Sequence, residues 1–479
     1  MNNTTKKRKC AIFGCGQIGK AAFYKLRNYY NIVCWLDNNS TLWNGMLFDL
    51  PILSPGTVAE LYMQEEMDIF VAILNGTEVV QWLRSRNIPN VYEWKNGFFY
   101  TIDGLFPLEF AVPPYIKSHN IDESNENILD ILFISDSAGI RDHKMASIIK
   151  KAGHRVFHAY ISRSPEIAYP EYKDLYEQIY PIMSLKSLED FVSNSDFDVI
   201  HASSQPDFVA ALLSGGDKPI ILDCHDLRSS NQQMTPDQLM MEYLAHTGAD
   251  GVIYPTESLR EEALRKYARP LGSTLVMENY ISADLIPTYR CEKKSKADGH
   301  IHCVYEGNLV MDKEKNYKYF KKIWSKILDA GIHIHFYSAN KNEAMELSGI
   351  SDKIHYEGNV SSHVLAYELS QYDVGLAIYN INAQNVSYLE KSSPNKVYEY
   401  LNAGIPIAVN GIESISNFVV SNGFGLKIDM SGDLVKQFME VASIRIPDDI
   451  LVKRGYVFEN LAQNLIDMYM HSIKNAGER

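Results

Sequence analysis

The sequence has 479 residues, 46% of them hydrophobic and 22% charged, so two or three domains are expected, each able to bury its own core. Its net charge of −13 argues against a general nucleic-acid binder. No apolar run approaches the roughly 18 residues of a membrane-spanning helix, no secretory segment follows the basic start, and the six cysteines lack C-x-x-C pairs. A cytoplasmic protein without zinc or a disulfide framework is expected.

Residues 9–37 follow the order of a Rossmann unit. A short apolar strand, KCAIF, runs into GCGQIG, which is followed by a helical stretch and a second apolar strand. In such a unit the glycines let the backbone approach a pyrophosphate, and an acid after the second strand holds ribose hydroxyls. The sequence therefore predicts a nucleotide or cofactor site made of Gly14, Gly16, Gly19 and Asp37.

A third strand at 68–74 and a helix at 78–86 complete a predicted Rossmann-like domain, residues 1–105. With LPILSP after the second strand, the domain resembles the small nucleotide-sugar-binding N-terminal domain of bacterial sugar acyltransferases. It also resembles NAD(P) domains, although no Tyr/Lys pair or His is positioned for hydride transfer. Three alternatives follow: a nucleotide or nucleotide sugar, NAD(P), or a retained fold that binds nothing.

Two further α/β segments follow a predicted linker, residues 106–127, where Pro, Asn and Glu replace the hydrophobic pattern. In 128–290 and in 291–450, strands that are apolar along their whole length alternate with helices. This pattern predicts parallel sheets covered on both faces. Residues 451–479 are expected to form closing helices.

Residues 391–410, KSSPNKVYEYLNAGIPIAVN, predict a loop, a helix, a tight turn and a strand. Ser393 suits the N-cap and Pro394 the first helical position. Gly404 suits the left-handed C-terminal cap, and 405–409 reads as a short buried strand.

On this helix Lys396, Glu399 and Asn402 share a predicted polar face. Free amides at a helix N-terminus and a nearby lysine suit a diphosphate, and a carboxylate one turn later suits ribose hydroxyls. The alternative is an ordinary amphipathic helix with a solvated Lys/Glu pair.

PNKVYEYLNAGIPIAV is similar to the nucleotide-binding signature of GT-B glycosyltransferases of the family 4 type, in which a proline, a lysine, a glutamate and a small-Gly-x-Pro turn recur in this order. The resemblance extends over about residues 128–429. It implies an α/β protein of GT-B architecture, with two Rossmann-like domains facing a cleft: 128–290 on the acceptor side and 291–450 on the donor side. The first Rossmann-like domain is additional.

The resemblance also implies site residues, with two departures from the family pattern. Asn308 stands where the family has an arginine, and Lys391 stands where a sugar-contacting glutamate is expected, with Glu390 one step away. The residues implied as catalytic are Lys313, Lys396, Glu390 and His225. Those implied as substrate-binding are Gly139, Gly307, Asn308, Val360, Ser393, Asn395 and Glu399. A structural histidine bonded to Asp223 or Asp226 is the alternative for His225.

The function that follows from the resemblance is a retaining hexosyltransferase. It would move a sugar from a UDP- or GDP-sugar to a glycan or lipid-linked acceptor in bacterial surface polysaccharide synthesis, without a metal or other cofactor. A lipid-linked acceptor would bring peripheral contact with the inner face of the cell membrane. The alternatives are a non-catalytic nucleotide-sugar-binding protein and a NAD(P)-dependent oxidoreductase acting through the first domain.

Overall fold

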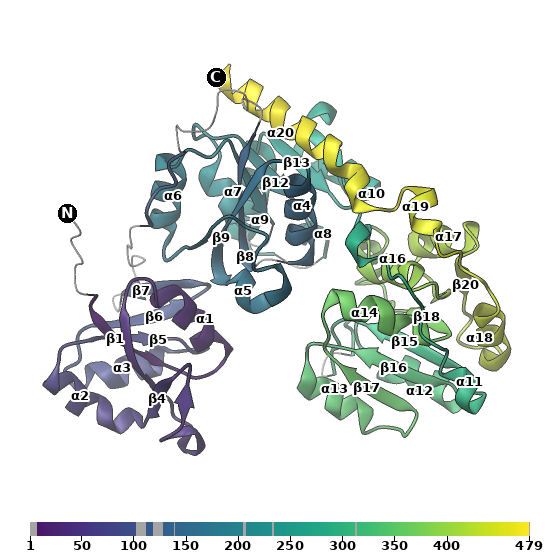
Figure 1. The fold of residues 1–479 in the computed structure, drawn as a ribbon, viewed down its shortest axis with the longest axis horizontal. Coiled ribbons are helices and arrows are strands. Elements are labelled where there is room, and N and C mark those ends of the chain that lie inside the picture. The colour runs from purple at the N-terminus through teal and green to yellow at the C-terminus, as the bar shows by residue number, and fades with distance from the viewer. Residues whose placement is uncertain are drawn as a thin grey trace. The chain divides into compact units, whose positions relative to one another are not determined.

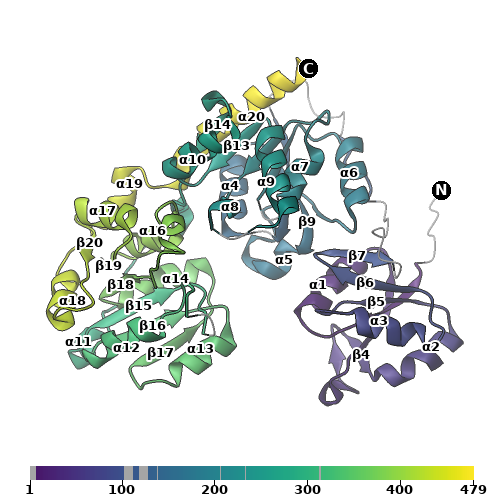
Figure 2. The same ribbon diagram turned by 180° about the vertical axis from the view of Figure 1, so that it is seen from behind.

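The computed structural model describes residues 7–101, 112–117, 128–137, 139–204, 207–231, 234–311 and 314–478. Of the predicted linker, only 112–117 lies within these ranges. The chain divides into two compact units, residues 1–222 with 248–250 and 471–479, and residues 223–247 with 251–470. The described residues form three sheets, each within one of the three predicted α/β segments (Figures 1 and 2). No helix in the described ranges is both long enough and apolar enough to cross a membrane.

The first sheet has the strand order β3-β4-β2-β1-β5-β6-β7 and is parallel from β4 to β6. Its strands are β1 (Lys9–Phe13), β2 (Asn31–Leu36), β3 (Met46–Leu47), β4 (Leu50–Leu53), β5 (Asp68–Val71), β6 (Val91–Lys95) and β7 (Phe98–Thr101), and its helices are α1 (Gln17–Leu26), α2 (Val58–Gln64) and α3 (Thr77–Arg84). Cys10 and Ile12 of β1 pack with α1, whereas Ala11 and Phe13 pack with α2 and α3. Successive residues therefore enter opposite cores, and helices cover both faces as the Rossmann pattern predicts.

The first domain packs against the second sheet through a buried lysine of α1. The Lys25 ammonium donates to the carbonyl oxygens of Gly97, 2.6 Å away, and Ile182, 2.5 Å away. The rings of Trp94, Phe98 and Tyr160 lie within 6 Å of it. Burial lowers the pKa of Lys25 well below its usual value. The first domain is thus docked on the second sheet through paired polar groups.

The second sheet has the order β10-β9-β8-β11-β12-β13-β14. Its strands are β8 (Asp130–Ser137), β9 (Arg155–Arg163), β10 (Ile179–Pro181), β11 (Val199–Ser203), β12 (Ile220–Asp223), β13 (Gly251–Tyr254) and β14 (Thr274–Val276), and its helices are α4 (Ile140–Lys151), α5 (Pro165–Ala168), α6 (Leu185–Asn194), α7 (Phe208–Leu213), α8 (Arg228–Asn231), α9 (Pro236–Gly248) and α10 (Glu257–Tyr267). The pattern MASIIKKAG predicts a helix that begins at Met145, whereas α4 begins five residues earlier, at Ile140. The reason is a cap: the amide of Gly139 donates to Asp142 Oδ2 over 2.7 Å, which stabilises the first turn.

The third sheet has the order β17-β16-β15-β18-β19-β20, and its described pairings are all parallel. Its strands are β15 (His302–Glu306), β16 (His333–Tyr337), β17 (Ile354–Gly358), β18 (Val374–Ala377), β19 (Ile407–Val409) and β20 (Gly425–Lys427). Its helices are α11 (Ser295–Asp298), α12 (Lys321–Asp329), α13 (Lys341–Ser348), α14 (Ser362–Glu368), α15 (Val386–Leu389), α16 (Asn395–Asn402), α17 (Glu413–Ser421) and α18 (Leu434–Ala442). Helices α12 and α13 lie beside β16 and β17 (Figure 1). The strand order reverses between β15 and β18, and ligands of open parallel sheets bind outside the carboxyl ends at such a point.

The C-terminal segment contains α19 (Ile450–Arg454) and α20 (Ala462–Gly477). The pattern NYKYFKKIWSKILDAG predicts a helix that begins at Asn316, and this prediction is wrong, because α12 begins only at Lys321. Asparagine side chains hold the preceding backbone, because Asn380 donates to the carbonyl of Glu314 and Asn382 to that of Lys315, over 2.7 and 2.8 Å. Carbonyls engaged in this way hold the segment in a loop at the carboxyl edge of the third sheet.

Candidate donor site

The helix α16 forms close to where the sequence places it. It begins at Asn395, with Pro394 as its N-cap (φ −71°, ψ 125°), one residue later than predicted. The Ser393 side chain does not cap the helix; its hydroxyl accepts from the amide of Asn279 over 3.4 Å. Gly404 has a φ of +69° and ends the helix in the left-handed conformation, as predicted.

The alternative of a solvated face on α16 is wrong. Lys396 is 8% exposed and Asn402 4% exposed, because the helix is enclosed on both sides. Asn402 donates to the carbonyl of Leu285 over 2.8 Å, and its own carbonyl accepts from Arg290. The reading of Lys396 as part of a solvated ion pair is therefore excluded.

Lys396 lies at the carboxyl ends of β15 and β18, where the strand order reverses. Its ammonium is 3.8 Å from the ring centroid of Tyr305, the fourth residue of β15, and 5.5 Å from that of Tyr379, which follows β18. A Cβ on Gly307 would lie 3.5 Å from the same nitrogen. The structure thus brings together Lys396 and Gly307, two of the predicted donor residues.

The electrostatics of this lysine suit an anionic ligand. Burial lowers the pKa of Lys396 to about 8, with the Glu306 and Glu399 carboxylates opposing the shift and Lys318 adding to it. An uncompensated buried ammonium is costly, and a bound phosphate would supply the opposite charge at hydrogen-bond distance. Glu399, one turn further along α16, is half-buried. Lys396 and Glu399 thus place an ammonium, which suits a diphosphate, and a carboxylate, which suits ribose hydroxyls, on the same helix.

Gly307 itself has a φ of +125°, a conformation that side-chain-bearing residues rarely adopt. Its amide donates to the carbonyl of Tyr337 over 3.0 Å, which fixes the turn after β15. Asn308 comes next and is exposed, and its carbonyl accepts from the Tyr305 hydroxyl over 3.0 Å. Lys313, the second cation predicted for this site, lies outside the described residues.

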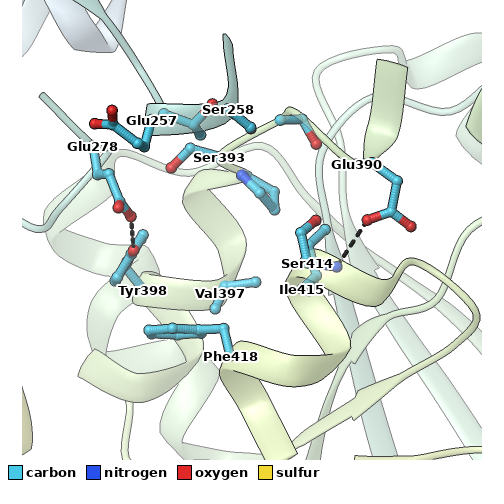
Figure 3. Close-up of a pocket in the computed structure, with 13 residues that line it drawn as sticks. Glu257, Ser258, Glu278, Glu390, Ser393, Val397, Tyr398, Ser414, Ile415 and Phe418 are labelled. Carbon is cyan, nitrogen blue, oxygen red and sulfur yellow. Dashed lines mark hydrogen bonds between the residues drawn. The ribbon is translucent and has the colours of Figure 1, made fainter. Parts of the chain in front are cut away.

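A cavity of about 320 Å³ opens beside the N-terminus of α16 (Figure 3). Its wall is built largely from the first turns of three helices, whose N-termini carry partial positive charge. These contribute Thr256, Glu257 and Ser258 at α10, Ser393 and Pro394 at α16, and Ser414 and Ile415 at α17. Val397, Tyr398 and Phe418 provide apolar surface. The cavity therefore combines helix N-termini with an aromatic wall next to the loop that enters the donor helix.

Two glutamates of the cavity are already hydrogen-bonded. Glu390 accepts from the amide of Glu413 over 2.6 Å and from that of Ser414 over 2.8 Å, at the start of α17; Figure 3 shows the bond to Ser414. Glu278 accepts from the Tyr398 hydroxyl, and burial raises the pKa of Glu278. The carboxylate predicted to touch the transferred sugar thus caps a helix, although it still lines the cavity.

The other predicted residues of this half occupy separate places. Asn395 is the first residue of α16, and Val360 is half-buried against the hydrophobic cluster that also contains Val397. His225 lies after β12, with its Nε2 3.0 Å from Asp223 Oδ2, so the bond expected by the structural alternative is present. Gly139 caps α4 as described above, and its amide is therefore engaged by Asp142.

The three glycines predicted to bind a ligand in the first domain differ in whether the fold leaves room for a side chain. Gly14 has a φ of +111°, and a Cβ there would lie 2.4 Å from Ile73 Cγ2. A Cβ on Gly19 would lie 1.8 Å from the Gly14 carbonyl oxygen, so α1 could not approach β1. Gly16, in contrast, has no atom within 4 Å of its hypothetical Cβ. The fold requires Gly14 and Gly19, and Gly16 leaves open space at the helix start.

Asp37, the fourth predicted residue of the first domain, braces the glycine-rich turn. Its carboxylate accepts from the amide of Cys15 over 2.7 Å and from that of Asn39 over 2.8 Å. The Cys15 contact joins the end of β2 to the turn between β1 and α1. The acid therefore lies beside the loop, as the Rossmann pattern predicts, and has an internal role there.

Sequence reasoning missed the residues that surround the predicted ones. Tyr305 and Tyr379 were visible only as the apolar ends of strands. Lys391, where the family pattern expects a glutamate, forms an ion pair with Glu262 of α10, and its carbonyl accepts from the Thr256 hydroxyl over 2.8 Å. No local pattern connects positions this far apart in the chain.

Two family models match the chain. Residues 141–284 match Glycosyltransferase Family 4, and residues 305–446 match the C-terminal domain of the Glucosyltransferase 3-like family. A solved glycosyltransferase from Rickettsia africae is similar in fold, with a TM-score of 0.51 and 13% identity over 73% of this chain and 100% of that one. Alr3699/HepE of Anabaena, solved with UDP and glucose, has a TM-score of 0.49 and 12% identity over 73% of this chain and 98% of that one. No protein of curated function matches the sequence.

Proposed function

We propose, from the premise that this chain is a GT-B glycosyltransferase of the family 4 type, that it transfers a sugar from a nucleoside diphosphate sugar to a glycan or lipid-linked acceptor. The observation that carries the proposal is the buried Lys396 ammonium beside Gly307, at the point where the third sheet reverses its strand order. A phosphate is the ligand that would best neutralise this cation.

The reaction needs stabilisation of a leaving nucleoside diphosphate. As the bond from the sugar carbon to the phosphate oxygen breaks, negative charge grows on that oxygen, and Lys396 and the N-terminus of α16 would stabilise it. The ammonium needs no reorganisation at that moment, because the rings of Tyr305 and Tyr379 already hold it in place. Glu399 would hold the ribose hydroxyls.

The stereochemistry that we propose is retention, without a metal. In this reaction the acceptor oxygen bonds to the sugar carbon on the face that the diphosphate leaves, and the acceptor proton passes to the departing phosphate oxygen. Such a step needs no separate general base, and we assign none. The residue predicted next to the sugar, Glu390, would contribute through the cavity wall, because its carboxylate holds the start of α17.

The biological role that we propose is synthesis of a bacterial surface polysaccharide, in the cytoplasm and in contact with the membrane where the acceptor is lipid-linked. The motif resemblance and the fused first domain support this proposal. We also propose that the first domain binds a nucleotide or nucleotide sugar. The open space at Gly16, between two glycines that the fold requires, supports that site.

Thermal shift with the full chain tests both nucleotide sites. The ligands are UDP-, GDP-, ADP- and CDP-sugars together with NAD⁺ and NADP⁺. Lys396→Met should abolish the shift caused by the donor, whereas the control Lys322→Met, at a 74% exposed side chain of α12, should keep it. Gly16→Val should abolish a shift that arises in the first domain, because the new side chain fills the open space without meeting protein atoms.

Turnover separates an enzyme from a nucleotide-sugar-binding protein. Nucleoside diphosphate release from the sugar that gives the largest shift should be detectable in the wild type and absent in Lys396→Met. A donor that binds through Lys396 but is never consumed, with or without added acceptor glycosides, would favour the binding protein. A shift with NAD(P) alone would favour the oxidoreductase.

A further inference from the structure

One face of the third sheet carries a row of histidines that the proposed transfer reaction does not use. His302 begins β15, His333 and His335 lie on β16, and His355 lies on β17. Cross-strand register places His302 opposite His333 and His335 opposite His355. The ring centroids lie 4.4 to 5.3 Å apart, with His355 stacked on His333 and His335 and with His302 tilted against the same two rings. Four imidazoles in contact form a titratable cluster in the donor half.

Within this row, two buried histidines link two carboxylates. Asp298 of α11 lies 3.1 Å from His302 Nε2, and His302 Nδ1 lies 2.8 Å from His335 Nε2. His335 Nδ1 lies 2.5 Å from Glu357 Oε1, on the fourth residue of β17. Both histidines are buried, whereas Asp298 is exposed. The three contacts form a continuous path from α11 across β15 and β16 to β17.

Counting hydrogens shows what this path requires. Each of the three contacts needs one hydrogen, and ionised carboxylates can only accept. Two neutral imidazoles carry one N–H each, which is enough for two contacts. At the third contact, an imidazole nitrogen without a hydrogen then faces a lone pair of its partner atom, and no hydrogen bond forms. One additional proton on the histidine pair supplies the missing hydrogen.

We propose that the His302–His335 pair takes up a single shared proton and thereby closes an unbroken hydrogen-bonded path from Asp298 to Glu357, so that the rigidity of the third sheet depends on pH. With the proton present, three contacts tie α11, β15, β16 and β17 together. When the proton is lost, one contact opens at the exposed Asp298 end. The hydrogen-bonded path is therefore complete at low pH, where the pair holds the proton, and incomplete at high pH, where the proton is lost.

The pKa directions of the flanking groups agree with one proton and not two. Hydrogen bonding to His335 lowers the pKa of Glu357, and the bond to the His300 amide is the main cause that lowers the pKa of Asp298 to about 2, so both carboxylates stay ionised. Burial lowers the pKa of His335 to about 4, which opposes a second proton on the pair. Interacting groups of this kind titrate as a unit.

Other titratable groups also face the pair and belong to the same electrostatic environment. They come from the neighbouring strands, from the residues that flank α11, and from the segments before β17 and β18. They are His300, His333, His355, Lys294, Asp352, Tyr372 and Asp373. Burial lowers the pKa of His333 and of His355, which favours the neutral form of both rings.

The test is proton-detected ¹⁵N NMR of the full chain labelled at histidine, recorded from pH 5 to pH 8.5. Variants at His302 and His335 assign the resonances. We expect both rings to report the uptake of one proton with a common midpoint. Asp298→Asn removes a charge at the exposed end and should lower that midpoint by about one pH unit. The control Asp329→Asn, at an exposed position at the end of α12, should leave it unchanged.

Hydrogen–deuterium exchange provides a measurement that does not depend on the assignments. At pH 5.5, the backbone amides of residues 295–306 should exchange about tenfold more slowly in the wild type than in Asp298→Asn. At pH 8.5, the exchange rates of the two proteins should agree after correction for intrinsic rates. Separate midpoints for the two rings, neutral rings down to pH 5, or a midpoint that Asp298→Asn does not move would each overturn the proposal.

Discussion

The buried Lys396 ammonium predicts a specific pH dependence of nucleotide binding. With a pKa of about 8 in the free protein, the lysine is about 90% charged at pH 7 and about 10% charged at pH 9. The terminal phosphate of UDP changes its charge little in this range, because its second ionisation, with a pKa near 6, is about 90% complete at pH 7. Since the diphosphate requires the charged form, the apparent affinity for UDP should fall about tenfold from pH 7 to pH 9.

Isothermal titration of UDP into the wild type and Lys396→Met measures this effect. The variant loses a charge-assisted hydrogen bond to phosphate, so at pH 7 it should bind about 10- to 150-fold more weakly. Its affinity should also be nearly flat from pH 7 to pH 9. Lys322→Met is the matched control and should reproduce the wild-type curve. A tenfold fall that persists in Lys396→Met would refute the assignment of Lys396 to the diphosphate.

Three further predictions concern stability and docking. Gly19→Ala should destabilise the first domain by about 3 kcal/mol, measured by urea unfolding, because its Cβ would lie 1.8 Å from the Gly14 carbonyl. Glu390→Ala should cost about 1 kcal/mol in the same assay, because two amides at the start of α17 lose their acceptor. Lys25→Glu should undock the first domain, seen as a larger radius of gyration in solution scattering, because a carboxylate would face two carbonyl oxygens.

Each of these changes has a matched control. Gly16→Ala meets no atom within 4 Å and should be nearly neutral. Glu440→Ala lies on an exposed position of α18 and should leave unfolding unchanged. Lys95→Glu reverses a half-exposed lysine close to Gly97 and should leave docking intact. Equal effects in a variant and its control would contradict the corresponding contact.

The pH dependence of stability provides an independent check on Lys396. Folding lowers its pKa from about 10.4 to about 8, so the unfolded chain binds more protons between those values. The stability of the wild type should therefore rise with pH across that window, whereas below pH 8 the buried charge imposes its full cost. Relative to Lys396→Met, the wild type should gain stability between pH 8 and pH 10 in urea unfolding. A constant difference would contradict the burial of a charged ammonium.

Local sequence determined most of the secondary structure and the succession of three α/β segments along the chain. Apolar strands alternating with helices lead to parallel sheets, because each strand must be buried on both faces. Glycine tolerates a positive φ better than other residues, so the positions of the turns at Gly404 and in G-x-G-x-x-G could be predicted from the sequence. The motif at 394–409 predicts the helix α16, and the family resemblance rests on the same residues.

Tertiary structure decided which side chains of that helix are buried and which contacts they make. Periodicity predicts a polar face with Lys396 and Asn402, and this face is enclosed, because residues distant in the sequence pack on both sides of α16. Glu390 caps a helix that begins 23 residues later, and Lys391 pairs with Glu262 on α10. Periodicity reports only neighbours within one or two turns. Burial, pKa shifts and charge pairing depend on contacts across the sheet, and only the folded chain brings those groups together.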